Sequence, residues 1–169
     1  MRRRGRKGGY NSSVTVGPDI LVVSPDELAT QLLVEVDVDS PVQDREASLK
    51  HQMIRMGAPT GLLVTPDWVT VFRDTFKSYS VDTIEAAERF PTNDIPELQR
   101  VADRKNGDRE ALEDAVQHWL TQLQYRVQSG QLATGLGDFK DALRAHILPV
   151  LQGGEIRAAG PRWPRRAAR

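Results

Sequence analysis

The segment from Gln31 to Val38 limits the folds open to this chain more than any other segment. Its side chains alternate in character, and side chains on a β-strand point to opposite faces with a period of two. One face would carry Leu32, Val34, Val36 and Val38, and the other would carry Leu33, Glu35, Asp37 and Asp39. Pro41 ends the run, because proline has no N–H for a sheet ladder. The pattern therefore predicts a half-buried strand with an acidic face.

Patterns on both sides of this strand predict an α/β unit with the order β-β-α-β-β. The other predicted elements are extended segments at 14–16 and 20–23, a helix from Gln43 to Met56 that ends at Gly57, and hairpin strands Gly61–Thr65 and Trp68–Phe72 around Pro66-Asp67. The pattern in the second half of the chain instead predicts four helices. Two short ones span Asp82–Phe90 and Pro96–Arg104, and a longer one begins after Asp108, which can act as its N-cap. The last spans Asp138–Leu151 and is interrupted near Pro149. We expect a small mixed sheet followed by a helical C-terminal half.

The net charge of zero conceals two basic ends. Residues 1–10 have five basic side chains and residues 155–169 have five against one acid, whereas residues 11–154 have 13 basic and 22 acidic side chains. Basic arms bind polyanions because they release counterions from phosphates. We expect them to contact nucleic acid, or alternatively to serve only as solubilising, unstructured tails.

Other features narrow the class of protein. No apolar run approaches the roughly 20 residues that span a bilayer, no apolar segment of a secretory signal follows the basic N-terminus, and cysteine is absent. We therefore expect a cytoplasmic protein with no membrane contact. The three histidines lack metal-ligand spacing, and common nucleotide-binding and hydrolase motifs are missing.

Three acids form a candidate metal site. Asp19 opens a predicted strand, and Glu35 and Asp37 lie on one face of the next strand. If the two strands pair antiparallel, the three carboxylates meet at one end of the sheet, and their oxygens suit Mg²⁺ or Mn²⁺. Alternatively, Glu35, Asp37 and Asp39 form the solvated face of a half-buried strand, which alternation alone would produce.

Four motifs between residues 17 and 73 follow one another in the order found in a known protein family. They are the run Gly17 to Val22, the run Leu32 to Asp37, Gln52 on the predicted helix, and the hairpin from Gly57 to Arg73 with Gly61-Leu62-Leu63-Val64-Thr65 and Trp68. Together they resemble the PD-(D/E)xK nuclease superfamily, and they are most similar to the N-terminal nuclease domain of type I restriction-enzyme R subunits. In that family a PD strand, an ExK strand, a helix carrying glutamine and a glycine-containing hairpin follow in this order.

The resemblance implies roles for individual residues. Asp19 and Glu35 would be metal ligands, assisted by the carbonyl of Val36, and Gln52 would orient water or phosphate. The family's lysine position falls on Asp37, which cannot donate a charge-assisted hydrogen bond and would act instead as a third ligand or a general base. Arg45 and Arg55 lie on roughly the same helix side as Gln52, and we favour Arg55 as a replacement cation, whereas Lys50 points away. A surface role for Arg55 is the alternative.

The resemblance also implies a restriction-endonuclease-like core and a function. The expected regions are a basic disordered tail at 1–12, the α/β core at 13–76, a helical region packed on or appended to it at 77–152, and a basic disordered tail at 153–169. The expected nucleic-acid contacts are Arg2, Arg3, Arg4, Arg6, Lys7, Arg55, Arg162, Arg165 and Arg166. The leading hypothesis is a Mg²⁺- or Mn²⁺-dependent endonuclease that cuts DNA in a prokaryotic restriction or defence system, with a partner protein subunit as a further expectation.

Two alternatives remain open at this point. One is a catalytically inactive nuclease-like module that binds nucleic acid or serves as an assembly subunit. The other is an unrelated α/β protein whose acids form only a polar strand face.

Overall fold

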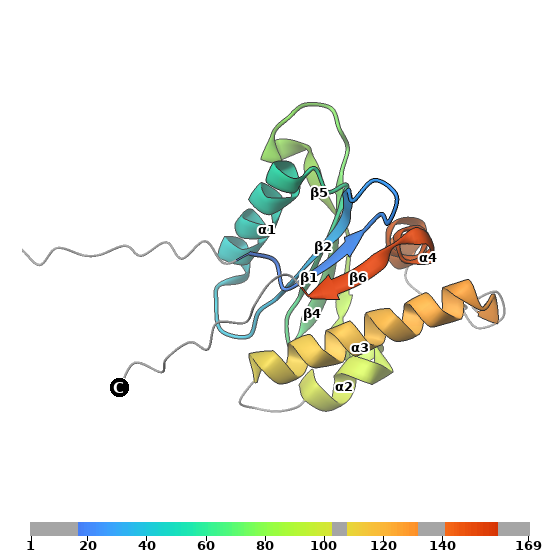
Figure 1. Cartoon of the computed structure of the whole chain (residues 1–169). Coiled ribbons are helices and arrows are strands. Elements are labelled where there is room, and N and C mark those ends of the chain that lie inside the picture. Colours follow the sequence, from blue (N-terminus) through green and yellow to red (C-terminus); the bar gives the residue numbers. More distant parts are fainter. Residues whose placement is uncertain (1–16, 103–107, 132–140, 159–169) are drawn as a thin grey trace, which may run out of the picture.

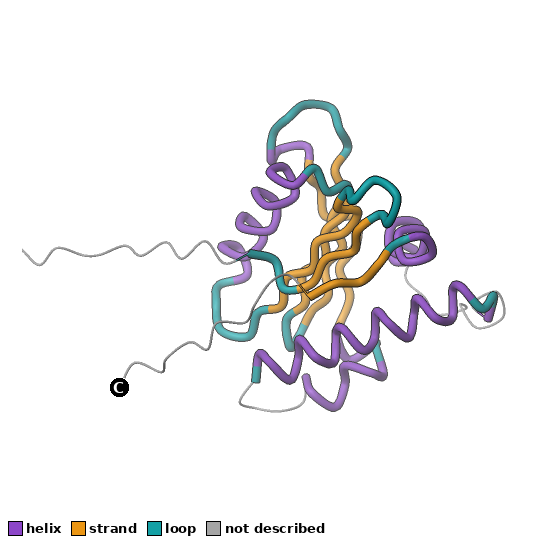
Figure 2. The backbone as a smooth tube through the Cα atoms, in the orientation of Figure 1, coloured by secondary structure: helices purple, strands orange, loops and turns teal. Residues whose placement is uncertain are grey.

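The computed structural model describes residues 17–102, 108–131 and 141–158, which form a mixed α/β fold (Figures 1 and 2). Six strands form one sheet in the order β5-β4-β3-β2-β1-β6. The strands are β1 (Ile20–Val23), β2 (Thr30–Val36), β3 (Thr60–Val64), β4 (Trp68–Asp74), β5 (Ile84–Pro91) and β6 (Glu155–Ala158). The helices are α1 (Val42–Met56), α2 (Pro96–Ala102), α3 (Arg109–Gln128) and α4 (Leu148–Gly153).

The first half of the fold follows the predicted order of elements. β1 pairs antiparallel with β2, with Ile20 opposite Val34, and β3 and β4 form the antiparallel hairpin. β2 and β3 run parallel, and such a pair needs a crossover, which α1 supplies. Gly57 ends α1 in the left-handed conformation that favours glycine. The β-β-α-β-β order is confirmed from residue 20 onward, and the segment at 14–16 lies outside the described residues.

Helices cover both faces of the sheet, as Figure 1 shows for α1 on one side and α2, α3 and α4 on the other. Leu33 of β2 packs with Leu49 and Met53 of α1, whereas the adjacent residues Leu32 and Val34 belong to the cluster on the opposite face. The predicted alternation is therefore correct. β2 is nevertheless buried on both faces and not half-buried, because α1 covers the acidic face and the helices of the second half cover the apolar face.

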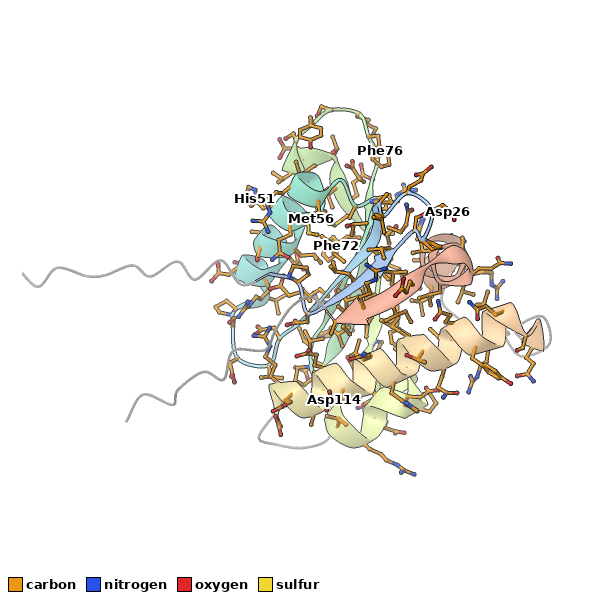
Figure 3. The ribbon with its side chains drawn as sticks, viewed as in Figure 1. Asp26, His51, Met56, Phe72, Phe76 and Asp114 are labelled. Carbon is orange, nitrogen blue, oxygen red and sulfur yellow. The ribbon has the colours of Figure 1, made fainter. Side chains whose placement is uncertain are left out.

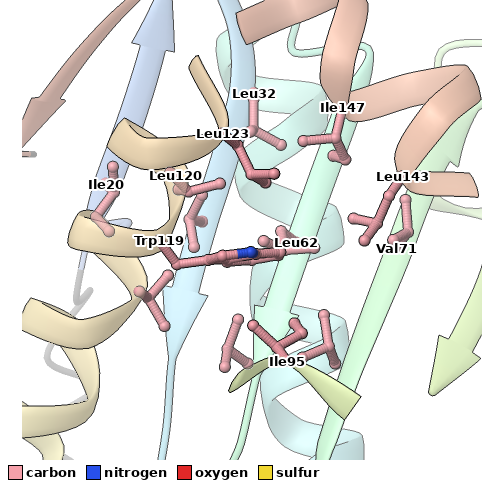
Figure 4. Packing of buried hydrophobic residues seen from close by; sticks show 14 of the residues in the cluster. Ile20, Leu32, Leu62, Val71, Ile95, Trp119, Leu120, Leu123, Leu143 and Ile147 are labelled. Carbon is pink, nitrogen blue, oxygen red and sulfur yellow. The ribbon is translucent and has the colours of Figure 1, made fainter. Parts of the chain in front are cut away.

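Trp119 is at the centre of the larger hydrophobic cluster. Figure 4 shows its indole between sheet residues such as Leu62 and the neighbouring Ile95. Its side chain is almost fully buried, and Leu120 and Leu123 extend the same face of α3 over the sheet. Trp119 is thus a core residue, as helical spacing in the sequence indicated.

The predicted helix at Asp82–Phe90 is wrong, because Ile84–Pro91 forms edge strand β5. Its Ala-Ala-Glu-Arg centre favours a helix by propensity, but β4 offers an antiparallel ladder from Trp68 to Asp74, with one register shift between Val71 and Phe72. Tertiary pairing overrides the weak local preference. Ile84 and Phe90 bury their side chains, while the residues between them are mostly exposed.

The chain returns to the sheet near its C-terminal end, where residues 153–169 were expected to be an unstructured tail. Glu155–Ala158 forms β6, which pairs antiparallel with β1. The helix before it has a π-helical segment at Leu143–Ile147, directly before α4. Pro149 lies in the first turn of α4, where its missing N–H is tolerated. Gln124 of α3 donates to the carbonyls of Leu151 and Gly154 at 2.9 and 2.6 Å, and so holds this turn.

Several expectations fall outside the described residues. They are the basic residues Arg2, Arg3, Arg4, Arg6, Lys7, Arg162, Arg165 and Arg166, the ends of two predicted helices at 103–104 and 138–140, and most of both predicted tails. Within the described ranges, no helix combines the length and the apolar character needed to cross a membrane.

Replacement of Gly154 by alanine tests the docking of β6. A Cβ atom there would lie 2.6 Å from the backbone carbonyl oxygen of Val150, which cannot rotate away. We expect Gly154→Ala to lower the free energy of unfolding by about 1–3 kcal/mol in urea denaturation. Gly153→Ala is the matched control, because a Cβ at Gly153 meets nothing within 4 Å. Equal stabilities of the two variants would contradict the described turn.

Candidate functional site

Asp19, Glu35 and Asp37 lie at the end of the sheet where β1 begins and β2 ends. Asp19 directly precedes β1, and Asp37 directly follows β2. The antiparallel register brings Asp19 back beside the end of β2. The backbone N–H of Val36 donates to Oδ2 of Asp19 at 2.7 Å, which fixes the carboxylate beside the strand. The two strands thus bring carboxylates 16 or more positions apart to one place.

The acids of β2 are buried. Glu35 and Asp37 are 1% and 4% exposed, while Asp39 beyond them is exposed. The alternative of a solvated face formed by Glu35, Asp37 and Asp39 is therefore wrong for Glu35 and Asp37 and holds only for Asp39. A buried carboxylate loses its hydration, so each acid needs a counter-charge or hydrogen-bond donors from the protein.

Arg45 of α1 supplies a counter-charge to both buried acids. Its Nη1 lies 3.0 Å from Oε1 of Glu35, and its Nη2 lies 3.2 Å from Oδ1 of Asp37 and 2.9 Å from Oγ of Ser40. Arg45 lies near the start of α1, beside the end of β2. Arg55, the cation favoured from the sequence, is exposed in the last turn, about 15 Å farther along the helix axis. The guanidinium at the acids therefore belongs to Arg45.

A second guanidinium reaches the site from the other face of the sheet. Nη2 of Arg109, the first residue of α3, donates to Oδ1 of Asp19 at 2.7 Å. Asp108 caps α3 by accepting hydrogen bonds from the N–H groups of Glu110 and Ala111, as its position in the sequence predicted. The second half of the chain therefore contributes directly to the acidic site.

Five of the six carboxylate oxygens contact an N–H group. Their partners are Val36 and Arg109 at Asp19, Ser40 and Arg45 at Asp37, and Arg45 at Oε1 of Glu35. The sixth, Oε2 of Glu35, is buried and has no hydrogen-bond partner among the described residues. A buried oxygen without a partner costs about 1–3 kcal/mol, and more when it is charged. This oxygen is therefore the open position of the site.

The surroundings of Glu35 disfavour its charged form. Burial raises the pKa of Glu35 above its ordinary value, and the negative charge of Asp19 adds to this effect. The hydrogen bond and the positive charge of Arg45, with a smaller contribution from Arg109, act in the opposite direction without cancelling it. Glu35 is thus held in a site that disfavours its own ionised form.

The donor atoms suit a hard cation, because carboxylate oxygens are the ligands that Mg²⁺ and Mn²⁺ prefer, and Oε2 of Glu35 is open. In the described part of the chain, however, no three His, Cys, Asp or Glu side chains form a group that could hold a metal ion. Arg109 already contacts Oδ1 of Asp19, and Arg45 already contacts Oδ1 of Asp37. The residues fit a divalent ion by their chemistry, with two guanidinium groups as competing cations.

Gln52 lies on the face of α1 that packs on the sheet. It is buried and donates from Nε2 to Oγ of Ser48 at 3.2 Å. Arg45, Ser48 and Gln52 follow one another at helical spacing, so Gln52 is about two turns from Arg45. His51 is exposed and points away from the sheet (Figure 3).

The sequence did not indicate Arg109, although it did indicate the capping Asp108 next to it. Arg109 and Asp19 are 90 positions apart, and no local pattern connects them. The one available signal was the need of a buried acid for a counter-charge, which does not say which of many arginines provides it.

Comparisons with protein-family models, with curated proteins and with solved structures gave no match to this chain.

Glu35→Gln should reveal the raised pKa as a dependence of stability on pH. The folded protein holds a proton on Glu35 more tightly than the unfolded chain, whose ordinary pKa is 4.5. Stability contributed by this proton is present at lower pH and is lost as pH rises from about 4.5 through the raised folded-state pKa. Glutamine does not titrate, so the stability of the variant relative to the wild type should rise over this interval.

Urea unfolding of both proteins between pH 4 and pH 8 measures the difference. Glu27→Gln, in the exposed turn after β1, controls for the loss of one negative charge. A stability difference that stays constant with pH, or falls as pH rises, would show that Glu35 is not held in a site that disfavours its charge.

Proposed function

We propose that this chain is a divalent-metal-dependent nuclease of the PD-(D/E)xK type that cuts nucleic acid, with DNA as the expected substrate, in a prokaryotic restriction or defence system. The observation that carries the proposal is the unpartnered Oε2 of Glu35, buried in a cluster of three carboxylates and two guanidinium groups carried by helices. A buried carboxylate oxygen without a partner is typical of a site that binds an ion, a water or a substrate.

The order and pairing of the elements also support the proposal. Asp19 precedes β1, Glu35 lies on antiparallel β2, Gln52 lies on the crossover helix, and a hairpin follows. This is the order of motifs that the resemblance to the superfamily implies. Fold alone does not establish function, so the argument depends on the site.

Each residue of the site has a role under this proposal. Asp19 and Glu35 would hold Mg²⁺ or Mn²⁺, which supplies stabilisation of the negative charge that develops on a phosphodiester in hydrolysis. Arg45 holds Glu35 and Asp37 in place and carries the positive charge that the lysine of the family would supply from position 37. Gln52 would orient phosphate or water from the same face of α1.

A second candidate function is favoured by a different observation. Five of the six carboxylate oxygens already have N–H partners, and Asp37 replaces the lysine. A site neutralised in this way can be stable without a metal ion. The chain would then be an inactive nuclease-like module that binds nucleic acid or assembles with a partner protein subunit.

Metal-dependent melting and cleavage distinguish the two functions. We expect Mn²⁺ to raise the melting temperature of the wild type by roughly 5–10 °C at a hundredfold excess over Kd, and Mg²⁺ to act at higher concentration. Plasmid, linear and single-stranded DNA and RNA are then incubated with the protein and each ion. Glu35→Ala should abolish both the shift and cleavage, whereas Glu27→Ala, in an exposed turn, should retain both.

Each outcome assigns the protein to one class. A melting shift with cleavage that requires Glu35 supports the nuclease. A shift without cleavage of any substrate supports an inactive module that has kept its metal site. Wild-type and Glu35→Ala proteins that melt alike across millimolar Mn²⁺, with no cleavage, would rule out the metal site and leave the module without metal or an unrelated α/β protein.

The basic ends provide a separate prediction about partners. Arg157 and Ala158 belong to β6, so a truncation that spares the sheet removes residues 1–12 and 159–169. We expect the truncated protein to bind DNA more weakly and with a flatter salt dependence, because each lost phosphate contact removes about 0.9 from the slope of log affinity against log salt. The slope is measured by fluorescence anisotropy. Unchanged affinity and slope would mean that the ends serve only solubility.

A further inference from the structure

We propose that Arg109 acts as a gate on the acidic site, because its guanidinium occupies the oxygen of Asp19 that a divalent ion would take. Helix α3, which the family motifs do not include, would then oppose metal binding. This inference rests on the proposed function, since it concerns an ion held by Asp19 and Glu35.

The contact has the geometry of a strong ion pair. Nη2 of Arg109 and Oδ1 of Asp19 are 2.7 Å apart, and the side chains are 23% and 10% exposed. Exposed ion pairs are screened by water and salt, whereas a partly buried pair keeps more of its attraction. Arg109 is therefore a real competitor for a cation at this carboxylate.

The position of Arg109 is set by the fold. It is the first residue of α3, directly after the capping residue Asp108, and Leu112 and Val116 anchor the following turns in the core. The cap is made by Asp108 and the N–H groups of Glu110 and Ala111, and it does not require the guanidinium. Removing the charge of Arg109 should therefore leave the start of α3 in place.

Asp19 differs from Glu35 in having no open oxygen. Its Oδ2 accepts from the N–H of Val36 at 2.7 Å, and its Oδ1 accepts from Arg109. At Glu35, Arg45 contacts Oε1 and leaves Oε2 without a partner, so an ion bound at Oε2 would not have to displace Arg45. An ion that also binds Asp19 has to displace Arg109 or share its oxygen, so Arg109 is the residue on which metal affinity depends.

The test is a titration of the whole chain with Mn²⁺ alone, measured by isothermal titration calorimetry. We expect Arg109→Gln to bind Mn²⁺ about fivefold or more tightly than the wild type, which is the lower range of measured couplings between sites. Arg109→Lys keeps the charge and should stay closer to the wild type. Arg126→Gln is the matched control, because Arg126 lies in the last turn of the same helix and pairs with Glu97 at 3.6 Å.

The outcomes separate this inference from the proposed function. Tighter binding in Arg109→Gln alone, with circular dichroism spectra like that of the wild type, supports the gate. Binding that is equal to or weaker than that of the wild type overturns the gate and leaves the metal site standing. Absence of Mn²⁺ binding in the wild type and in all variants overturns the metal site and the gate together.

Discussion

The arrangement at the end of β2 follows from burying charge under two layers of helices. β2 has apolar neighbours on both faces, so Glu35 and Asp37 leave water as the strand folds. Desolvating a carboxylate costs several kcal/mol unless opposite charge and hydrogen bonds replace the lost hydration. Arg45 contributes opposite charge to both acids, although Oε2 of Glu35 stays without a partner, and it joins the start of α1 to the end of β2. The packing of α1 on the sheet and the geometry of the acidic site therefore depend on the same contacts.

Local patterns in the sequence predict the parts of the fold that local physics determines. The period-two run gives β2, the apolar stripe before Gly57 gives α1, and Asp108 caps α3. The nearness of Asp19 to the end of β2 follows once β1 and β2 pair antiparallel. These features depend on neighbours in sequence, or on strands joined by a short turn.

The remaining features depend on partners far away in the chain. β5 has a helix-forming composition and becomes a strand only because β4 pairs with it, and β6 lies in a segment that resembles a tail until it meets β1. The identity of the counter-cations is equally non-local. Arg45 and Arg55 were both plausible by helical period, and only the position of the end of β2 along α1 distinguishes them.

The effect of an aspartate at position 37 on the charge of the site depends on the two arginines. A lysine there would place one positive charge between Asp19 and Glu35, whereas the actual site combines three carboxylates with two guanidinium groups from opposite faces of the sheet. Both arrangements carry a formal charge of −1 when all groups are ionised. In this site the cations are therefore carried by helices, and Arg109 makes the charge balance at Asp19 depend on α3. A fragment ending near residue 76 would keep all three acids and lose Arg109, so the counter-charge at Asp19 comes from the second half of the chain.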